Sequence, residues 1–330
     1  MFGISDLVGF LKTDFAKNDW WRTSVGDIND PVDAKDIEAK SPFHHAEKIT
    51  APLLLTTGSK DERVQHSREN GLWFEKEATI SEYSVAQIQE AFKGARWFET
   101  DGCYTLFDGQ YGSTGKGLLA SLIGQTMGHK IDTVTTNAGP NSGHTGYLNG
   151  DKILTQQIPV ASVVMRNLGY SHSCYLNAGA IIDPNQLWKE ICEYGYDDKT
   201  LVNESPLFIH PAAAVIKPEH QGDQHSDIAS TGKGVGPAME AKISRNDQAV
   251  FGGFTPVAWD EFYSCHNWVR PEKISYANLG RCFVETAQGW SLGINSGFYP
   301  YTTSRECSVT QALSATINSE TSSSIVRSAL

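Results

Sequence analysis

Apolar residues in the middle of the chain form short runs separated by glycine-rich or polar segments. The run YTLF at 104–107 is typical of a buried strand, and the glycine-rich segment DGQYGSTGKG follows it at 108–117. The next run, LLASLIGQTMG at 118–128, has the length and composition of a helix, and 131–136 is typical of another strand. This strand, loop, helix and strand order predicts an α/β fold with a mostly parallel sheet.

The segments on either side of this unit show different patterns. Residues 84–99 place apolar side chains at helical spacing, so we expect a helix there, with Ser84 as its N-cap. The tail at 314–330 is rich in Ser and Thr and has little to bury, so we expect it to be disordered. We therefore expect four parts, namely 1–80, a helical linker at 81–103, a main domain at 104–313 and the tail at 314–330.

Composition excludes several classes of protein. The chain has 330 residues and a net charge of −11, and it carries no run of Lys or Arg, which argues against binding to a nucleic acid polymer. No apolar stretch is long enough to span a membrane, and the N-terminus lacks the features of a secretory signal, so a cytoplasmic location is expected. The six cysteines are scattered without a CxxC pair, which argues against a cysteine metal site.

The glycine-rich loop is a candidate phosphate site. Glycines at a turn from a strand to a helix allow backbone N–H groups to approach an anion, and the helix N-terminus adds partial positive charge. The loop is not a P-loop, because that motif needs Gly at position 110 and Ser or Thr at 117, where this chain has Gln110 and Gly117. The loop alone is therefore a weak indication of nucleotide binding.

Four ordered motifs turn this indication into a specific resemblance. They are FDGQYGSTGKGL after the first strand, NSGHT at 141–145, STGKGVGPAMEAKISR at 230–245 and ETAQGWSLGINSGFYPYTTS at 285–304. Together they resemble the signatures of the adenylosuccinate synthetase family over about 210 residues. The resemblance implies the family's nucleotide core as the fold. It also implies ligation of L-aspartate to a purine monophosphate through a 6-phosphoryl intermediate, with Mg²⁺ and with ATP or GTP as phosphoryl donor.

The resemblance also assigns roles to matching positions. Ser113 and His144 occupy the two catalytic positions, and Ser113 together with the Gly143 carbonyl occupies the metal-binding positions. Arg245 matches an arginine that reaches the neighbouring subunit's monophosphate, which implies a homodimer. The positions matching the triphosphate site are Gly112, Thr114, Gly115, Lys116, Gly117, Gly143 and Thr145, and those matching the nucleotide substrate site are Asn141, Ser230, Thr231, Arg245, Gln288 and Thr303.

One departure from the family bears on the substrate. Where the family has an aspartate that removes the purine N1 proton, this chain has Ser113, and serine cannot act as a carboxylate base. Phage-type relatives that take dGMP also lack this aspartate, so the resemblance favours dGMP over IMP.

A second departure lies toward the C-terminus. After Ser314 nothing resembles the family's aspartate-binding loop or its triphosphate-base turn. An IMP-using enzyme and an inactive nucleotide-binding remnant therefore stay open as alternatives.

The first part of the chain resembles a different family. The segment SPFHHAEKITAPLLLTTGSKDERV at 41–64 resembles the catalytic region of prolyl-oligopeptidase-type serine hydrolases, with Asp61 at the position of the triad aspartate. The resemblance implies that an α/β-hydrolase fragment precedes the nucleotide core. The chain contains no GxSxG nucleophile motif and no matching His loop, so we expect this fragment to be non-catalytic, with a serine peptidase as the alternative.

Overall fold

The computed structural model describes residues 8, 11–12, 22, 25–40, 85–197, 205–222, 230–252, 269–271 and 278–317. The chain divides into two compact units, Met1–Ala86 with Ser113–Gly115, and Gln87–Gly112 with Lys116–Leu330. The hydrolase-like segment at 41–64, Asp61 and the expected cap Ser84 lie outside the described residues, and the hydrolase resemblance stays a prediction. None of the helices in the described ranges is long and apolar enough to cross a membrane.

The described part of the smaller unit is built around one helix. Helix α3 spans Pro31–Lys40, and Asp30 caps its N-terminus by accepting hydrogen bonds from the backbone amides of Val32 and Asp33. Ile37, on the inner face of α3, is buried against Leu11.

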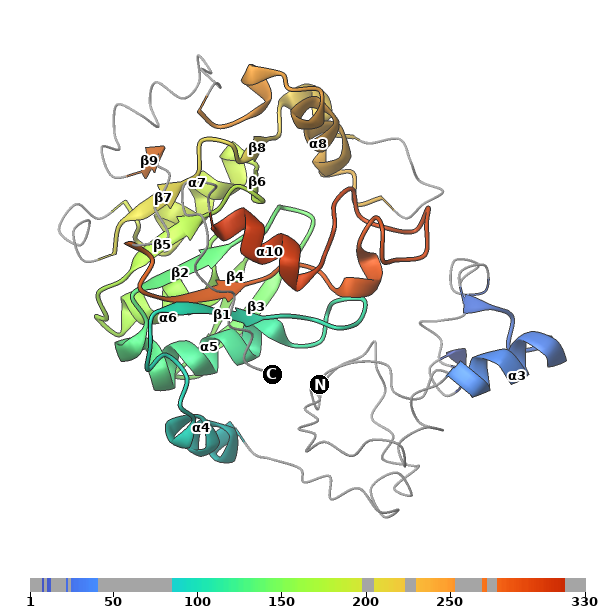
Figure 1. The fold of residues 1–330 in the computed structure, drawn as a ribbon, viewed down its shortest axis with the longest axis horizontal. Coiled ribbons are helices and arrows are strands. Elements are labelled where there is room, and N and C mark those ends of the chain that lie inside the picture. The colour runs from blue at the N-terminus through green and yellow to red at the C-terminus, as the bar shows by residue number, and fades with distance from the viewer. Residues whose placement is uncertain are drawn as a thin grey trace. The chain divides into compact units, whose positions relative to one another are not determined.

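A six-stranded parallel sheet organises the larger unit (Figure 1). Its strands are β1 Gly102–Leu106, β2 Thr133–Thr136, β5 Ser173–Leu176, β7 Leu207–Ile209, β9 Val269–Pro271 and β10 Arg281–Glu285. Their order is β1-β10-β2-β5-β7-β9, and every neighbouring pair is parallel. The predicted α/β class and parallel sheet are confirmed.

Two further pairs of short strands form separate two-stranded sheets. A hairpin joins β3 His144–Leu148 to β4 Asp151–Thr155, and its turn places Asn149 and Gly150 in the left-handed region, as a two-residue hairpin turn requires. Strands β6 Ile181–Ile182 and β8 Ala214–Val215 form a small parallel pair. Short 3₁₀ turns cover Gly128–Lys130, Pro218–His220, Asp247–Ala249 and Trp290–Leu292.

Helices cover both faces of the sheet. One face packs against α5 Lys116–Met127 and α6 Val160–Asn167, and the other packs against α10 Val309–Thr316 (Figure 1). Strand residues alternate accordingly, since Phe283 joins the core on the α5 and α6 side while its neighbours Cys282 and Val284 join the α10 side. The remaining helices are α4 Val85–Gly94, α7 Pro184–Glu193 and α8 Val235–Ile243.

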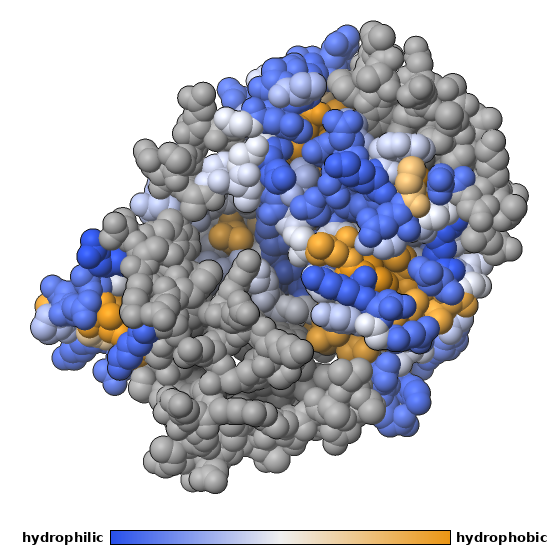
Figure 2. All heavy atoms as spheres, turned by 180° about the vertical axis from the view of Figure 1, so that it is seen from behind, coloured by the Kyte–Doolittle hydropathy of each residue, from blue (hydrophilic) through white to orange (hydrophobic). Residues whose placement is uncertain are grey.

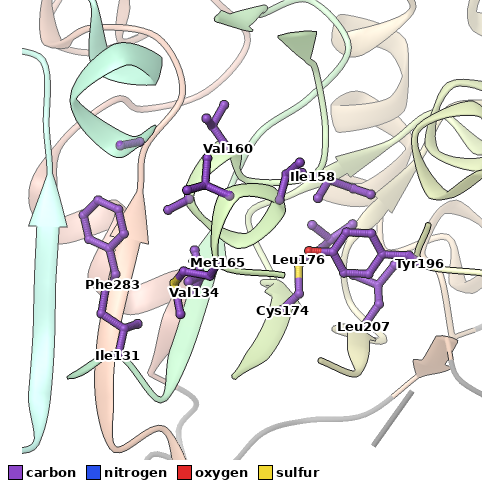
Figure 3. Packing of buried hydrophobic residues seen from close by; sticks show 14 of the residues in the cluster. Ile131, Val134, Ile158, Val160, Met165, Cys174, Leu176, Tyr196, Leu207 and Phe283 are labelled. Atoms are coloured by element: carbon purple, nitrogen blue, oxygen red, sulfur yellow. The ribbon is translucent and has the colours of Figure 1, made fainter. Parts of the chain in front are cut away.

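The main core lies between the sheet and the pair α5 and α6. Figure 3 shows Met165 of α6 beside Val134 of β2, with Phe283 on the next strand. These side chains are at most 2% exposed, as expected for strands covered on both faces. Among the residues coloured in Figure 2, polar residues predominate, with smaller apolar patches between them.

The element boundaries differ from the sequence predictions in two places. The helix expected at 84–99 ends at Gly94. The last turn of α10 includes Ala315 and Thr316, which were expected in the disordered tail; both are buried, and the Thr316 hydroxyl donates to the Ala312 carbonyl. The serine- and threonine-rich composition concealed this turn, because the residues it buries are small or hydrogen-bond within the helix.

Candidate nucleotide site

The candidate site begins where β1 ends. The loop after β1 runs from Asp108 to the first residue of α5, Lys116, and Gly112, Ser113 and Gly115 within it have positive φ angles of 92°, 54° and 86°. A serine in the left-handed region is uncommon and strained. The loop therefore takes the tight path that brings a strand end into a helix N-terminus, as expected from its glycines.

An ion pair spans the two ends of this loop. The Lys116 ammonium donates to Asp108 Oδ2 at 2.9 Å, and both residues are buried. Asp108 Oδ1 also accepts a hydrogen bond from the Gln110 amide at 2.8 Å. The predicted phosphate-binding lysine is thus held by a carboxylate that sequence reasoning did not single out.

The NSGHT segment packs directly against the start of α5. A Cβ on Gly117 would lie 2.6 Å from both the backbone nitrogen and the carbonyl oxygen of Thr145, so only glycine allows this approach. His144 begins β3 and is buried, and its Nε2 has no hydrogen-bond partner. Asn141 also has a buried atom without a partner, its Oδ1.

Burial controls the charge of His144. It lowers the pKa of His144 to about 3, with smaller contributions in the same direction from the positive charges of Lys116 and Arg305. The imidazole is therefore neutral near pH 7. Its unpartnered Nε2 is available to a ligand in a region where positive charge dominates.

The ETAQG segment completes the site from the end of β10. Gln288 has a φ angle of 64°. Its side chain connects the predicted site residue Thr303 to Arg305, because Nε2 donates to Thr303 Oγ1 at 3.2 Å and Oε1 accepts from Arg305 Nε at 3.0 Å. Gly289 packs so closely against the Gln110 carbonyl and the Gly112 amide that no Cβ would fit. Segments almost 180 residues apart in sequence are thereby joined.

Glu285, at the end of β10, has a structural role. Its carboxylate accepts hydrogen bonds from the Val160 and Ala161 amides at 3.0 and 2.6 Å, which caps α6. Burial raises its pKa to about 7, although these two hydrogen bonds act in the opposite direction.

The third motif contributes α8. Ser230 Oγ accepts a hydrogen bond from the Gly232 amide at 3.3 Å, and Thr231 is exposed before the helix begins. Arg245 is exposed just after the helix, with a φ angle of 59°. Between them, Lys242 extends from α8 to the Ala178 carbonyl at 2.6 Å. Burial lowers the pKa of Lys242 to about 8, and the charge of Arg305 adds to this shift.

The predicted residues therefore fall into two groups. Lys116, Gly117, His144 and Thr145 lie together at the loop, and Gln288 with Thr303 joins them through Arg305. Thr231 and Arg245 lie at the exposed ends of α8, and the homodimer expected through Arg245 stays a prediction.

Two residues that sequence reasoning missed hold the site together. Asn137 Oδ1 accepts from the Ala287 amide at 3.0 Å, and the Asn137 carbonyl accepts from Arg305. Arg305 follows the TTS end of the fourth motif, where a charged residue beside predicted ligands could have been noticed.

The described residues offer few ligands for a magnesium ion. No group of three or more His, Cys, Asp or Glu side chains comes together within the described ranges. Asp108 is paired with Lys116, and Ser113 and Gly143 offer only neutral oxygens. The residues fit an ion held chiefly by triphosphate oxygens, the usual arrangement for Mg²⁺, with the Gly143 carbonyl as a protein ligand.

The carboxyl edge of the parallel sheet carries a glycine loop, a helix N-terminus and buried cations. These features define an α/β domain of the nucleotide-binding class. Comparison with known proteins shows similarity to one family within this class. Residues 106–261 match the family model described as adenylosuccinate synthetase.

Individual relatives agree with this match. The chain is 35% identical over 217 residues to N6-succino-2-amino-2'-deoxyadenylate synthase of Vibrio phage phiVC8, covering 61% of this chain and 58% of the relative. It is 30% identical over 253 residues to adenylosuccinate synthetase of Xanthomonas oryzae pv. oryzae, covering 63% and 56%. The chain thus spans less than two thirds of these relatives.

Solved structures share the fold. The succinoaminodeoxyadenylate synthetase of cyanophage S-2L, bound to dGMP and dATP as an energy donor, has a TM-score of 0.52 at 28% identity, covering 66% of this chain and 60% of that one. Adenylosuccinate synthetase from Plasmodium falciparum has a TM-score of 0.50 at 21% identity, covering the same shares, and supports the fold alone. The matched part of this chain is therefore similar in sequence to the adenylosuccinate synthetase family of carbon–nitrogen ligases.

Proposed function

We propose that this protein joins L-aspartate to dGMP, with ATP as phosphoryl donor, and forms 2-aminodeoxyadenylosuccinate, ADP and phosphate. The observation that carries the choice of substrate is Ser113, at the position where IMP-using members have a catalytic aspartate. The similarity to two phage proteins supports it, one an N6-succino-2-amino-2'-deoxyadenylate synthase and the other solved with dGMP.

The proposed reaction has two steps. The γ-phosphoryl group of ATP passes to the purine O6, which breaks its bond to the β-phosphate oxygen and releases ADP, while the purine N1 loses its proton to water. The neutral aspartate amine then attacks C6, phosphate leaves, and the new amine gives up a proton to water. Phosphorylation converts a poor leaving oxygen into a good one, so the second step no longer has to expel an oxide. Mg²⁺ would shield charge on the triphosphate, and the Gly143 carbonyl would help to hold it.

The chain's own residues have defined tasks in this proposal. Lys116 and the N-terminus of α5 bind the triphosphate, for which the Lys116 ammonium exchanges Asp108 for phosphate oxygens. Neutral His144 can donate a hydrogen bond to an oxygen of the transferring group from its buried ring. Gln288 and Thr303 hold the nucleotide substrate.

Ser113 affects recognition of guanine. Guanine differs from hypoxanthine by an amino group beside N1, and a serine is smaller than an aspartate and uncharged. A hydrogen bond from Ser113 is worth about 0.5–1.5 kcal/mol, which is up to about tenfold in affinity. The proposed preference for dGMP over IMP is of this size.

Calorimetry and product analysis on the full chain test the proposal. We expect dGMP to bind about tenfold more tightly than IMP, and Ser113→Asp to reduce that ratio. Ser314→Asp adds the same charge at an exposed position on α10 and should leave the ratio unchanged. Mass spectrometry should detect 2-aminodeoxyadenylosuccinate when dGMP, ATP and aspartate are present. A wild-type preference for IMP would replace this proposal with the adenylosuccinate reaction.

A further inference from the structure

Arg305 is a buried cation with one unused donor. The residue is 4% exposed, and its Nε and Nη1 donate to three oxygens, those of Gln288, Asn137 and Gly179. Its Nη2 is buried and has no hydrogen-bond partner. Each of these three acceptors is a neutral amide or carbonyl oxygen, so none neutralises the guanidinium charge.

Other cations close to Arg305 add to this positive charge. Arg305 Nη1 donates to the Gly179 carbonyl and Lys242 donates to the carbonyl of the preceding residue, Ala178, so the two cations lie close together. Lys116 is neutralised by Asp108. Lys242 donates to a carbonyl, so Arg305 and Lys242 leave about two positive charges without a carboxylate among these contacts. Burying unpaired charge is costly, and such a region favours an anion.

We propose that Arg305 Nη2 binds an oxygen of the substrate's 5'-monophosphate, with Lys242 supplying the second positive charge. The proposal deepens the proposed function and rests on it. A guanidinium is suited to phosphate because its planar N–H donors match the spacing of phosphate oxygens. The phosphate carries close to two negative charges near neutral pH, which offsets the charges of Arg305 and Lys242.

The contacts of Arg305 favour the monophosphate over the triphosphate. Arg305 hydrogen-bonds to Gln288, which in turn holds Thr303, and both are expected to hold the nucleotide substrate. The glycine loop has its own cation, Lys116, for the triphosphate. Arg305 therefore orients the Gln288 amide with Nε and leaves Nη2 for the ligand.

The main experiment measures how much the phosphate contributes to binding. Calorimetry on the full chain compares the dissociation constants of dGMP and deoxyguanosine, which differ only in the phosphate. We expect Arg305→Gln to reduce the preference for dGMP about 10- to 100-fold, as for a hydrogen bond to a charged group. Arg305→Lys keeps the positive charge but lacks the planar donors, so its preference for dGMP should lie between those of the wild-type protein and Arg305→Gln. Arg281→Gln removes an arginine at the opposite end of β10 and should change nothing.

A measurement on the wild-type protein covers the case in which Arg305→Gln does not fold. Calorimetry follows the binding of inorganic phosphate to the wild-type protein and to Lys242→Gln, which removes only the second charge of the proposed site. We expect phosphate to bind the wild-type protein and to bind Lys242→Gln more weakly. L-aspartate, added separately, tests whether a carboxylate binds in the same way.

The outcomes separate this inference from the proposed function. A folded Arg305→Gln that retains the full preference for dGMP overturns the role of Arg305, while the ligase proposal stands. Equal phosphate affinity of the wild-type protein and Lys242→Gln, or binding of aspartate without binding of phosphate, also overturns it. Wild-type protein that binds no purine nucleotide but binds phosphate in a Lys242-dependent way would sink the proposed function and retain an anion site at Arg305.

Discussion

Two buried histidines of this protein differ in what surrounds them. Burial lowers the pKa values of both, to about 3 for His144 and about 4 for His172. His172 has partners on both ring nitrogens, the Ser162 hydroxyl at 2.7 Å and the Tyr170 carbonyl at 2.8 Å, whereas His144 Nε2 has none. A shifted pKa therefore does not distinguish a structural histidine from a candidate ligand, but an unpartnered buried atom does.

Among the residues that the structure describes, two buried arginines repeat this contrast. Arg166 donates to the Gly195 and Ser205 carbonyls and stacks over the Tyr196 ring, 4.6 Å from its centroid. Figure 3 shows the Tyr196 hydroxyl pointing toward Cys174 within the same buried region. Arg305 retains an unused donor. Substitutions in the Arg166 region should thus affect stability, and those in the Arg305 region should affect binding.

The largest expected effect concerns the two histidines. His144→Ala should reduce dGMP-dependent ADP formation about 100- to 10,000-fold, the range for a positioned proton-transfer or hydrogen-bonding group. Its free energy of unfolding should fall by less than in His172→Ala, because its removal leaves a cavity but fewer polar groups without a partner. His172→Ala should instead lower the free energy of unfolding by about 2–4 kcal/mol, since it leaves a cavity and unpaired polar groups. Coupled-enzyme assays measure ADP formation and urea unfolding measures the stability of the two variants. A larger loss of stability in His144→Ala than in His172→Ala, together with a loss of activity in a stable His172→Ala, would contradict the contrast between the two histidines.

Glu285 provides a pH test of a buried group outside the ligand site. Its pKa is raised to about 7 in the folded chain, against an ordinary value of 4.5, so the folded state holds this proton more tightly. Its contribution to stability is therefore greatest below about pH 4.5 and falls by up to about 3 kcal/mol as the pH rises to 7. Glu285→Gln should flatten the dependence between pH 5 and 8. The exposed Glu193→Gln is the control, and identical slopes in all three proteins would refute the assignment.

Two glycines test how tightly the loop and the NSGHT segment pack. Gly117→Ala should cost about 1–3 kcal/mol of unfolding free energy, because its Cβ would meet the Thr145 backbone. A Cβ on Gly143 would meet only Leu154 Cδ1, at 3.9 Å, so Gly143→Ala should have almost no effect on stability. Thermal unfolding distinguishes them, and equal melting temperatures would argue against the close approach.

The smallest effect is expected at an ion pair away from the site. Asp132 accepts two hydrogen bonds from the Arg281 side chain, at 2.7 and 2.8 Å, and the pair is partly exposed. These bonds lower the pKa of Asp132. Asp132→Asn should cost at most about 1 kcal/mol, since water and salt screen such pairs. Nucleotide affinity should not change, and a loss in calorimetry would show that the two ends of the sheet are coupled.

Local patterns in the sequence were enough to predict part of this structure. The order from β1 through the glycine loop and α5 to β2 follows from periodicity and glycine positions, which depend on neighbouring residues. Sequence periodicity did not reveal that β10 lies between β1 and β2, because strand order depends on contacts across the whole domain.

The candidate site shows the same limit. His144 and Lys116 could be named from their motifs, but the Lys116–Asp108 pair and the free Nη2 of Arg305 depend on side-chain positions. The roles given to Ser113, Thr231 and Arg245 stay predictions. The buried end of α10 was missed because Ala315 and Thr316 are not large apolar residues.

The position of β10 also affects how the chain can fold during synthesis. Strands β1 and β2 emerge from the ribosome early, but neither pairs with the other, because both hydrogen-bond to β10, which is made about 150 residues later. Until then each strand has an open edge facing the empty position, and such edges are prone to pairing with other chains. The glycine loop is fixed against Gly289 only after β10 inserts, so the nucleotide site should be among the last parts of the domain to form.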